Sequence, residues 1–142
     1  MNPTRSRSVT VLIVAVVASA LVSATADAGE ISIDIAPATL NLQSRGTVVT
    51  VHTDIPYADV DVVSVYLAGV AIASWKADDR GFFVAKFAMD EVKTIDGLVI
   101  NGANTFQLVG LDVFGEPFWG EQEVMVIDRG PRPSGTRRSV DQ

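Results

Sequence analysis

The chain has 142 residues, a formal net charge of −6, one histidine and no cysteine. This length holds one domain, and 48% hydrophobic with 20% charged residues is a globular rather than a disordered composition. The lack of cysteine excludes disulfide bonds, thiolate catalysis and cysteine-bound zinc. Because His52 is the only histidine, one chain cannot form a multi-histidine metal site.

Residues 1–28 have the pattern of a secretory signal peptide. Arg5 and Arg7 precede an apolar run at 9–22, and small residues follow, as in Ala24-Thr25-Ala26. The apolar run spans 14 residues, whereas a membrane span needs about 20. The pattern therefore predicts a cleaved signal rather than a retained anchor. We expect a secreted, extracytoplasmic protein (periplasm or cell surface) without membrane attachment after cleavage.

Charge is distributed unevenly along the chain. Residues 27–128 contain 16 acidic and five basic side chains, a net charge of −11, whereas residues 129–142 carry a net charge of +3. An acidic body disfavours nucleic acid and anionic lipid as partners, because phosphate contacts need clustered Lys and Arg. The segment 129–142 is rich in Arg, Pro and Gly, which predicts a disordered tail.

The hydrophobic pattern of residues 29–128 is that of β-strands. Seven strands are expected, in chain order at 31–42 (interrupted by Pro37), 47–53, 60–67, 70–75, 82–87, 105–111 and 118–127. A strand that contains a proline sits most easily at a sheet edge.

The connections between these strands are also predicted from local sequence. A loop is expected at 54–59, a hairpin turn at 68–69, and a turn at 77–81 in which Gly81 takes a positive φ. Residues 88–95 favour one or two helical turns. Gly120, inside the last strand, predicts a bulge or bend.

Seven short strands in about 100 residues predict an all-β fold, a single antiparallel β-sandwich. The core is expected to contain the apolar side chains that alternate along these strands: Ile33, Leu40, Val49, Val51, Val65, Leu67, Ile72, Val84, Phe87, Phe106, Leu108, Val124 and Val126.

Several stretches resemble a known group of proteins. The first is ISIDIAP (31–37), and the clearest are TVVTVHTDIP (47–56), WKADDRGFFVAKF (75–87) and GEPFWGEQEVMVID (115–128). In these stretches the chain is similar to secreted bacterial immunoglobulin-like modules of unassigned function. The resemblance implies an immunoglobulin-like β-sandwich of about seven strands outside the cytoplasm, and it implies no catalytic residues.

Three aromatic side chains are candidate binding residues. Trp119, Tyr57 and Trp75 lie near predicted strand ends or in loops, where flat aromatic rings commonly anchor proteins or sugars. For each tryptophan the alternative is packing in the core. If Phe118 points inward, strand alternation makes Trp119 point outward.

Acidic side chains between the second and third strands are candidate calcium ligands. Asp54, Asp59 and Asp61 fall in this connection, and calcium prefers oxygen ligands from such loops. The alternative is that these carboxylates are only solvated, since no D-x-D-x-D-G string is present. No other cofactor is expected.

No catalytic constellation is evident. Strand alternation places His52 opposite Val49 and Val51, and no G-x-S-x-G nucleophile signature occurs. We expect that the protein is not an enzyme.

Two functions are therefore expected as alternatives. The first is a non-catalytic binding or adhesion module that engages an extracellular protein or polysaccharide through strand-end loops. The second is a structural, self-associating component of the cell surface or extracellular matrix. In the second, the edge strand 31–42 would pair with another copy, and the Arg-rich tail would contact that copy's acidic body.

Overall fold

The computed structural model of the chain describes residues 29–130. The signal peptide expected at 1–28 and residues 131–142 of the expected tail lie outside the described residues. Residues 128–130, which follow the last strand, have no regular secondary structure.

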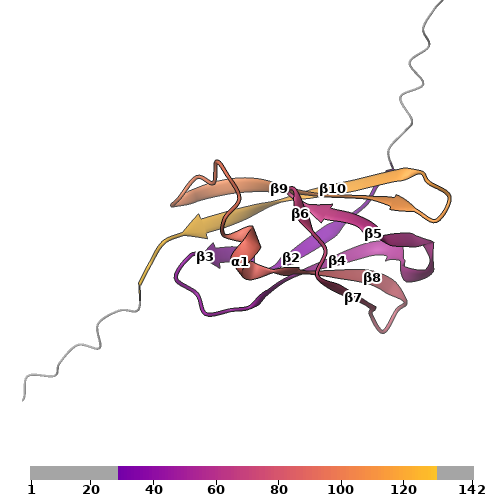
Figure 1. The fold of residues 1–142 in the computed structure, drawn as a ribbon, viewed down its shortest axis with the longest axis horizontal. Helices are drawn as coiled ribbons and strands as arrows, with labels where there is room; N and C mark the ends of the chain where they lie inside the picture. Colours follow the sequence, from indigo (N-terminus) through magenta and orange to yellow (C-terminus); the bar gives the residue numbers. More distant parts are fainter. Residues whose placement is uncertain (1–28, 131–142) are drawn as a thin grey trace, which may run out of the picture.

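The described residues form two β-sheets that share one hydrophobic core, which confirms the expected all-β sandwich (Figure 1). The first, called here the large sheet, has the order β1 (Gly29–Glu30), β10 (Pro117–Ile127), β9 (Gly102–Asp112), β5 (Val60–Leu67) and β6 (Val70–Ala71), with β3 (Thr39–Asn41) also paired to β10. The second, the small sheet, has the order β2 (Ile33–Ala36), β4 (Val48–Pro56), β8 (Phe82–Ala88) and β7 (Ser74–Ala77).

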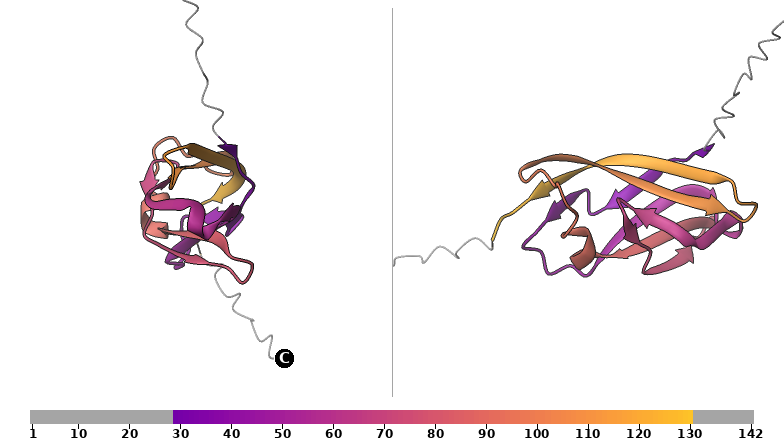
Figure 2. Two further views of the ribbon diagram at one scale, coloured as in Figure 1. Left: turned by 90° about the vertical axis from the view of Figure 1, so that its right-hand side faces the viewer. Right: turned by 45° about the horizontal axis from the view of Figure 1, so that its top comes forward.

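Three connections lie together at one end of the sandwich, on the right in Figure 1. They are the 3-10 turn η1 (Tyr57–Asp59), the β7–β8 turn at 78–81 and the β9–β10 turn at 113–116. Pairing brings them together, because Pro56 is the register partner of Phe82 and Val60 is that of Asp112. The view along the molecule in Figure 2 shows the same end from the front.

The interruption at Pro37 divides the first strand between the two sheets. Pro37, which follows a cis peptide bond, separates β2 at the edge of the small sheet from β3, which pairs in parallel with β10. The expected edge position is confirmed for both parts, but residues 31–42 form two short strands in different sheets rather than one interrupted strand. The backbone N–H of Ile35 on β2 donates to Gln122 Oε1 at 2.7 Å, which links this edge to the other sheet.

The strand expected at 70–75 is wrong as a single element. The N–H of Ile72 donates to the carbonyl oxygen of Val65 in the large sheet at 3.1 Å. The N–H of Ala73, one residue later, donates to the carbonyl oxygen of Lys86 in the small sheet at 2.9 Å. The chain thus crosses between the sheets at this point. It leaves β6 and β7 as two short strands.

Two other local expectations need correction. Asp54 was expected to open a loop, but β4 continues to Pro56, so the connection is only the 3-10 turn. Gly120 was expected to mark a bulge or bend, but β9 and β10 pair across it without a register shift, so the bulge is wrong. A Cβ atom at Gly120 would lie 2.8 Å from the carbonyl oxygen of Ile31, so the glycine permits close backbone approach.

The helical turn expected within 88–95 is confirmed as α1 (Met89–Val92), whose Met89 and Val92 are buried. Most of the expected core is confirmed as well, but Ile33 and Ile72 are only partly buried at its margin. Val84 is fully buried, yet it lies on the outer side of the small sheet between its register partners His52 and Lys76.

Phe83 and Ala85, which were not among the expected core residues, also belong to the core. Because Val84 faces outward, the inward positions of β8 are Phe83, Ala85 and Phe87, all fully buried. Burial of each large apolar side chain contributes roughly 1.5–3 kcal/mol. The sandwich is thus closed by apolar burial in a chain without disulfides.

Candidate functional site

The outer face of the large sheet carries a continuous row of side chains. Register pairs Ala71 with Tyr66, Tyr66 with Val109, Val109 with Trp119, and Trp119 with Glu30, across five strands. Partners in register share one face of a sheet. Leu111 and Pro117 form the neighbouring pair on the same face. We name the five larger apolar residues of these two rows the large-sheet patch: Tyr66, Val109, Leu111, Pro117 and Trp119.

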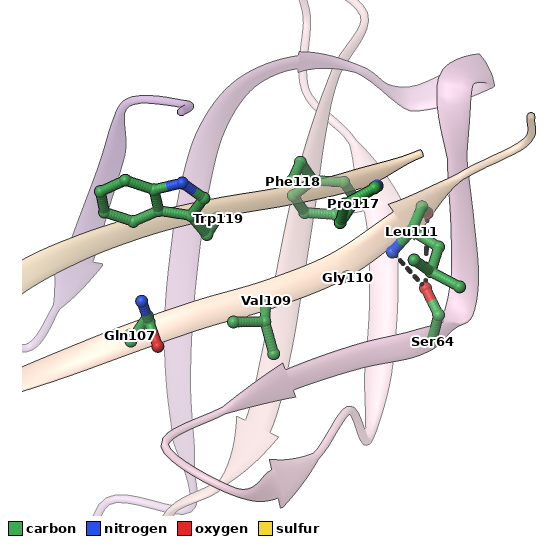
Figure 3. A pocket seen from close by; sticks show the side chains of 8 residues that line it. All are labelled: Ser64, Gln107, Val109, Gly110, Leu111, Pro117, Phe118 and Trp119. Carbon is green, nitrogen blue, oxygen red and sulfur yellow. Dashed lines mark hydrogen bonds between the residues drawn. The ribbon is translucent and has the colours of Figure 1, made fainter. Parts of the chain in front are cut away.

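A shallow hollow of about 390 Å³ lies over this patch (Figure 3). Trp119, Val109, Leu111 and Pro117 supply most of its lining, and Ser64 and Gln107 supply polar groups. Figure 3 shows Val109 and Gln107 side by side on β9, with Trp119 on the adjacent strand. The combination of an aromatic ring, aliphatic side chains and two hydrogen-bonding groups suits an amphipathic ligand.

A second hollow of similar size, about 380 Å³, lies on the small sheet and has a different character. Its lining includes Asp34, His52, Asp54 and Arg80. Since the two volumes are nearly equal, the chemistry of the lining distinguishes them. Apolar and aromatic side chains line most of the hollow on the large sheet, whereas charged side chains and His52 line most of the hollow on the small sheet.

A β-bulge in β5 shapes one wall of the first hollow. The pairing of β5 with β9 shifts register between Asp61 and Tyr66. At this point the Ser64 hydroxyl donates to the carbonyl oxygen of Asp61 at 2.6 Å and accepts from the N–H of Leu111 at 2.8 Å. The Ser64 side chain thus replaces a missing backbone contact between the strands, and Figure 3 shows its hydrogen bonds to Leu111 as dashed lines.

The β9–β10 turn extends the apolar surface beyond the strands. Asp112 Oδ1 accepts from the N–H groups of Phe114 at 2.9 Å and Glu116 at 2.8 Å, and Gly115 takes a φ of 81°. The turn is tied to η1 by the N–H of Val113, which donates to the carbonyl oxygen of Asp59. Phe114 is 83% exposed at the tip.

The β7–β8 turn has the same construction. Asp78 Oδ1 accepts from the N–H groups of Arg80 and Phe82 at 2.8 and 2.9 Å, and Gly81 has a φ of 85°. The expected positive φ at Gly81 is confirmed. Both turns have the sequence Asp-x-x-Gly, but this turn pattern was predicted only at 78–81, whereas the second was expected only as a connection at 114–116.

Charge on the large sheet has one sign. Its strands and the β9–β10 turn contain no Lys or Arg. They contain six carboxylates, of which all but the half-buried Asp112 are exposed: Glu30, Asp61, Asp112, Glu116, Glu121 and Glu123. Within the described residues the basic side chains lie on the small sheet, in loops or after the last strand.

The structure places the three candidate aromatics at separate positions. Phe118 is buried and Trp119 lies on the opposite, outer face, as the alternation predicted. Trp75 is 40% exposed on β7, at the edge of the small sheet. Tyr57 lies in η1, with its ring centroid 6.4 Å from that of Phe83. Of the three, only Trp119 lines the apolar hollow.

The three candidate calcium ligands lie on different elements. Asp54 is on β4, where its Oδ1 accepts from the N–H of Ser32 at 2.9 Å; Asp59 is in η1 and Asp61 on β5. In the part of the chain that the structure describes, no three His, Cys, Asp or Glu side chains come close enough to hold a metal ion. His52 is exposed and lies opposite Val49 and Val51, as expected.

Comparisons of the chain with protein-family models, curated proteins and solved structures find no match. Among residues 29–130, no helix is long and apolar enough to cross a membrane.

Proposed function

We propose that the protein is a secreted, non-catalytic, immunoglobulin-like module that binds an extracytoplasmic protein or glycan through the large-sheet patch. The single observation that carries this proposal is the apolar hollow around Trp119 on the outer face of the large sheet. It refines the expected use of strand-end loops, because the β9–β10 turn continues that surface at one end of the sandwich.

Strand order supports the immunoglobulin-like assignment. The small sheet has the order β2-β4-β8-β7. If β2, β4, β5, β7 and β8 are taken as strands A to E, this is the order A-B-E-D of one sheet of an immunoglobulin domain. The order β10-β9-β5 of the large sheet corresponds to GFC. The segment 31–42, which takes the place of strand A, also contributes to both sheets: β2 pairs with β4 and β3 pairs with β10.

Exposure of apolar side chains supports binding at the patch. Tyr66, Val109 and Leu111 are each about 40% exposed, although all three lie within paired strands of the large sheet. Grouped exposed apolar side chains on a soluble domain are typical of an interaction surface. Tyr and Trp in such groups commonly contribute most of the binding energy.

The test uses residues 29–142 immobilised against fractionated envelope protein and polysaccharide from the source organism. Once a retained component is purified, its dissociation constant is measured for Tyr66→Ala and Trp119→Ala. We expect each substitution to weaken binding by about tenfold or more, as at hot-spot aromatics. Melting temperatures verify that the variants remain folded.

The matched controls are on the other sheet. Val48 on β4 is 39% exposed and Trp75 on β7 is 40% exposed, close to Val109 at 38%. Val48→Ala and Trp75→Ala should leave the dissociation constant unchanged, whereas Val109→Ala should raise it. Loss of binding in Trp75→Ala together with normal binding in Trp119→Ala would contradict the proposal.

One observation favours the alternative, a self-associating structural component of the cell surface or matrix. All four residues of the edge strand β7 are exposed. The Asp78 N–H bonds to Phe82 on β8, and hydrogen-bonding direction alternates along an antiparallel strand, so the backbone groups of Trp75 and Ala77 point away from the sheet. Such an edge can accept a strand from another copy.

This alternative moves self-association from the expected edge at 31–42 to β7. Trp75→Pro would block strand addition, because proline removes the outward N–H donor. Sedimentation of the wild-type chain at high concentration should then show oligomers that the variant lacks. A monomer under all conditions eliminates the alternative.

A further inference from the structure

We infer that the partner of the large-sheet patch is a cationic protein segment, in which Lys or Arg side chains flank an apolar one. The inference rests on the proposed function and names the chemistry of its partner. It comes from two features of one surface: an apolar centre, and surrounding strands and a β9–β10 turn that contain carboxylates but no Lys or Arg.

The rim carboxylates are next to the patch in register. Glu30 ends the row that contains Trp119, and Asp61 pairs with Leu111. Glu121 follows two residues after Trp119 on the same face of β10, and Glu116 precedes Pro117. A bound segment that covers the patch would therefore place its flanking side chains against carboxylates on several sides.

Charge complementarity discriminates among partners. A second copy docked face to face would oppose two sets of the same carboxylates, and an anionic polysaccharide would meet the same repulsion. Exposed charges interact over about 8–10 Å at physiological ionic strength, so the whole rim acts on a ligand at the patch. A cationic ligand gains attraction and faster association from the same field.

The apolar centre discriminates further. A ligand with positive charges alone would contact the rim but would leave Val109, Leu111 and Trp119 in water. Removal of apolar surface from water adds favourable free energy in proportion to the area covered. The preferred ligand therefore combines both features, and a charge-only ligand binds more weakly.

The experiment titrates residues 29–142 with three synthetic peptides of equal length. One alternates Lys with Leu, the second Glu with Leu, and the third Lys with Ser. The chain contains two tryptophans, so Trp75→Phe leaves Trp119 as the only indole and its fluorescence reports on the patch. We expect binding of the Lys-Leu peptide, no binding of the Glu-Leu peptide, and at least about tenfold weaker binding of the Lys-Ser peptide.

A charge-reversal pair tests the role of the rim. Glu121 and Asp34 are both exposed carboxylates on strands, on the outer faces of opposite sheets. Glu121→Lys should weaken binding of the Lys-Leu peptide about fivefold at low salt, and less at high salt. Asp34→Lys should leave it nearly unchanged.

Other occupants give different outcomes, each of which overturns the inference. Equal binding of the Glu-Leu and Lys-Leu peptides shows that charge does not select the partner. Tighter peptide binding after removal of residues 131–142 that persists at high salt, where long-range charge effects are screened, shows that this segment of the chain rather than a separate partner occupies the patch. Dimerisation that Val109→Ala abolishes identifies a second copy as the occupant.

The outcomes also separate this inference from the proposed function. If Tyr66→Ala abolishes binding of the retained envelope component but Glu121→Lys does not affect it, the patch is the binding site. The inference that its partner is cationic is then wrong. If the Lys-Leu peptide binds Tyr66→Ala and Val109→Ala as tightly as it binds the unsubstituted protein, the large-sheet patch is not the binding site.

Discussion

Two aspartates shape the turns at one end of the molecule by accepting backbone hydrogen bonds. Asp78 and Asp112 each fix a four-residue turn that contains a positive-φ glycine. The N–H of Phe82 is the main cause that lowers the pKa of Asp78 below its ordinary value of 3.8, and the N–H and guanidinium of Arg80 act in the same direction. The ionised carboxylate is therefore favoured in the folded state.

A depressed pKa in the folded state has a defined effect on stability. The contribution of the Asp78 charge is complete above the pKa of the unfolded chain and is lost as the pH falls through the lower folded pKa. Asp78→Asn keeps an acceptor but removes the charge. We expect the variant to melt below the wild type at pH 7, with a difference that shrinks below about pH 4.

Thermal melts of both proteins between pH 7 and pH 3 measure this difference, and Asp79→Asn in the same turn serves as the control. A difference that stays constant across the range would show that the charge of Asp78 does not contribute.

Thr53 makes a buried hydrogen bond between two central strands. Its hydroxyl donates to the carbonyl oxygen of Phe83 at 2.6 Å, and the residue is buried. Thr53→Val keeps the shape but removes the donor. We expect a loss of about 1 kcal/mol in the free energy of unfolding, measured by urea denaturation. An unchanged midpoint would mean that the hydroxyl makes no net contribution.

Gly115 is the position in the β9–β10 turn that needs a left-handed backbone. Its φ is 81°, and nothing lies within 4 Å of a Cβ atom built there. Gly115→Ala therefore tests backbone strain without a steric clash. We expect a loss of about 1–2 kcal/mol, the cost of that conformation for an alanine. The surface glycine Gly29, also free of neighbours at Cβ but without a positive φ, provides Gly29→Ala as the control.

At the scale of the strand, the bulge in β5 determines which side chains line the hollow. Ser64 bridges β5 and β9 through its hydroxyl, so it fixes the place where register changes. Ser64→Ala leaves the Leu111 N–H without this acceptor. We expect a loss of about 1 kcal/mol in stability and a rise in the amide hydrogen exchange rate of Leu111. Unchanged exchange at Leu111 would contradict this role.

Local sequence predicted strands well where one face is apolar and the other polar. Val49, Val51 and His52 on β4 follow this rule, and their orientations are confirmed. It failed where tertiary pairing decides the element. Residues 70–75 have a continuous strand propensity, but the chain between Ile72 and Ala73 transfers its hydrogen bonds from one sheet to the other, which no local pattern encodes.

Parts of the candidate site were hidden for the same reason. Trp119 could be identified as an aromatic residue near a strand end that would point outward if Phe118 pointed inward, and Phe118 is buried. Tyr66 and Val109 were missed because the β5 bulge shifts the register that brings them together. The repeated Asp-x-x-Gly spacing was the available signal for the turn at 112–115, which carries the exposed Phe114.

For the whole molecule, the arrangement separates stability from recognition. The core lies between the sheets, whereas the large-sheet patch lies outside it on the same strands, so patch side chains can be changed without opening the core. Phe83→Ala, in the core, should cost about 3–5 kcal/mol. Exposed patch substitutions such as Val109→Ala should cost less than about 1 kcal/mol, which urea denaturation of both variants would show.

The most direct test of the account is a hydrogen-exchange footprint of the retained envelope component on residues 29–142. If the component binds at the large-sheet patch, amide exchange should slow on binding in β9, β10 and the 113–116 turn, with β7 unchanged. Protection confined to β7 or to β2 would contradict it and would assign the interaction to an edge of the small sheet.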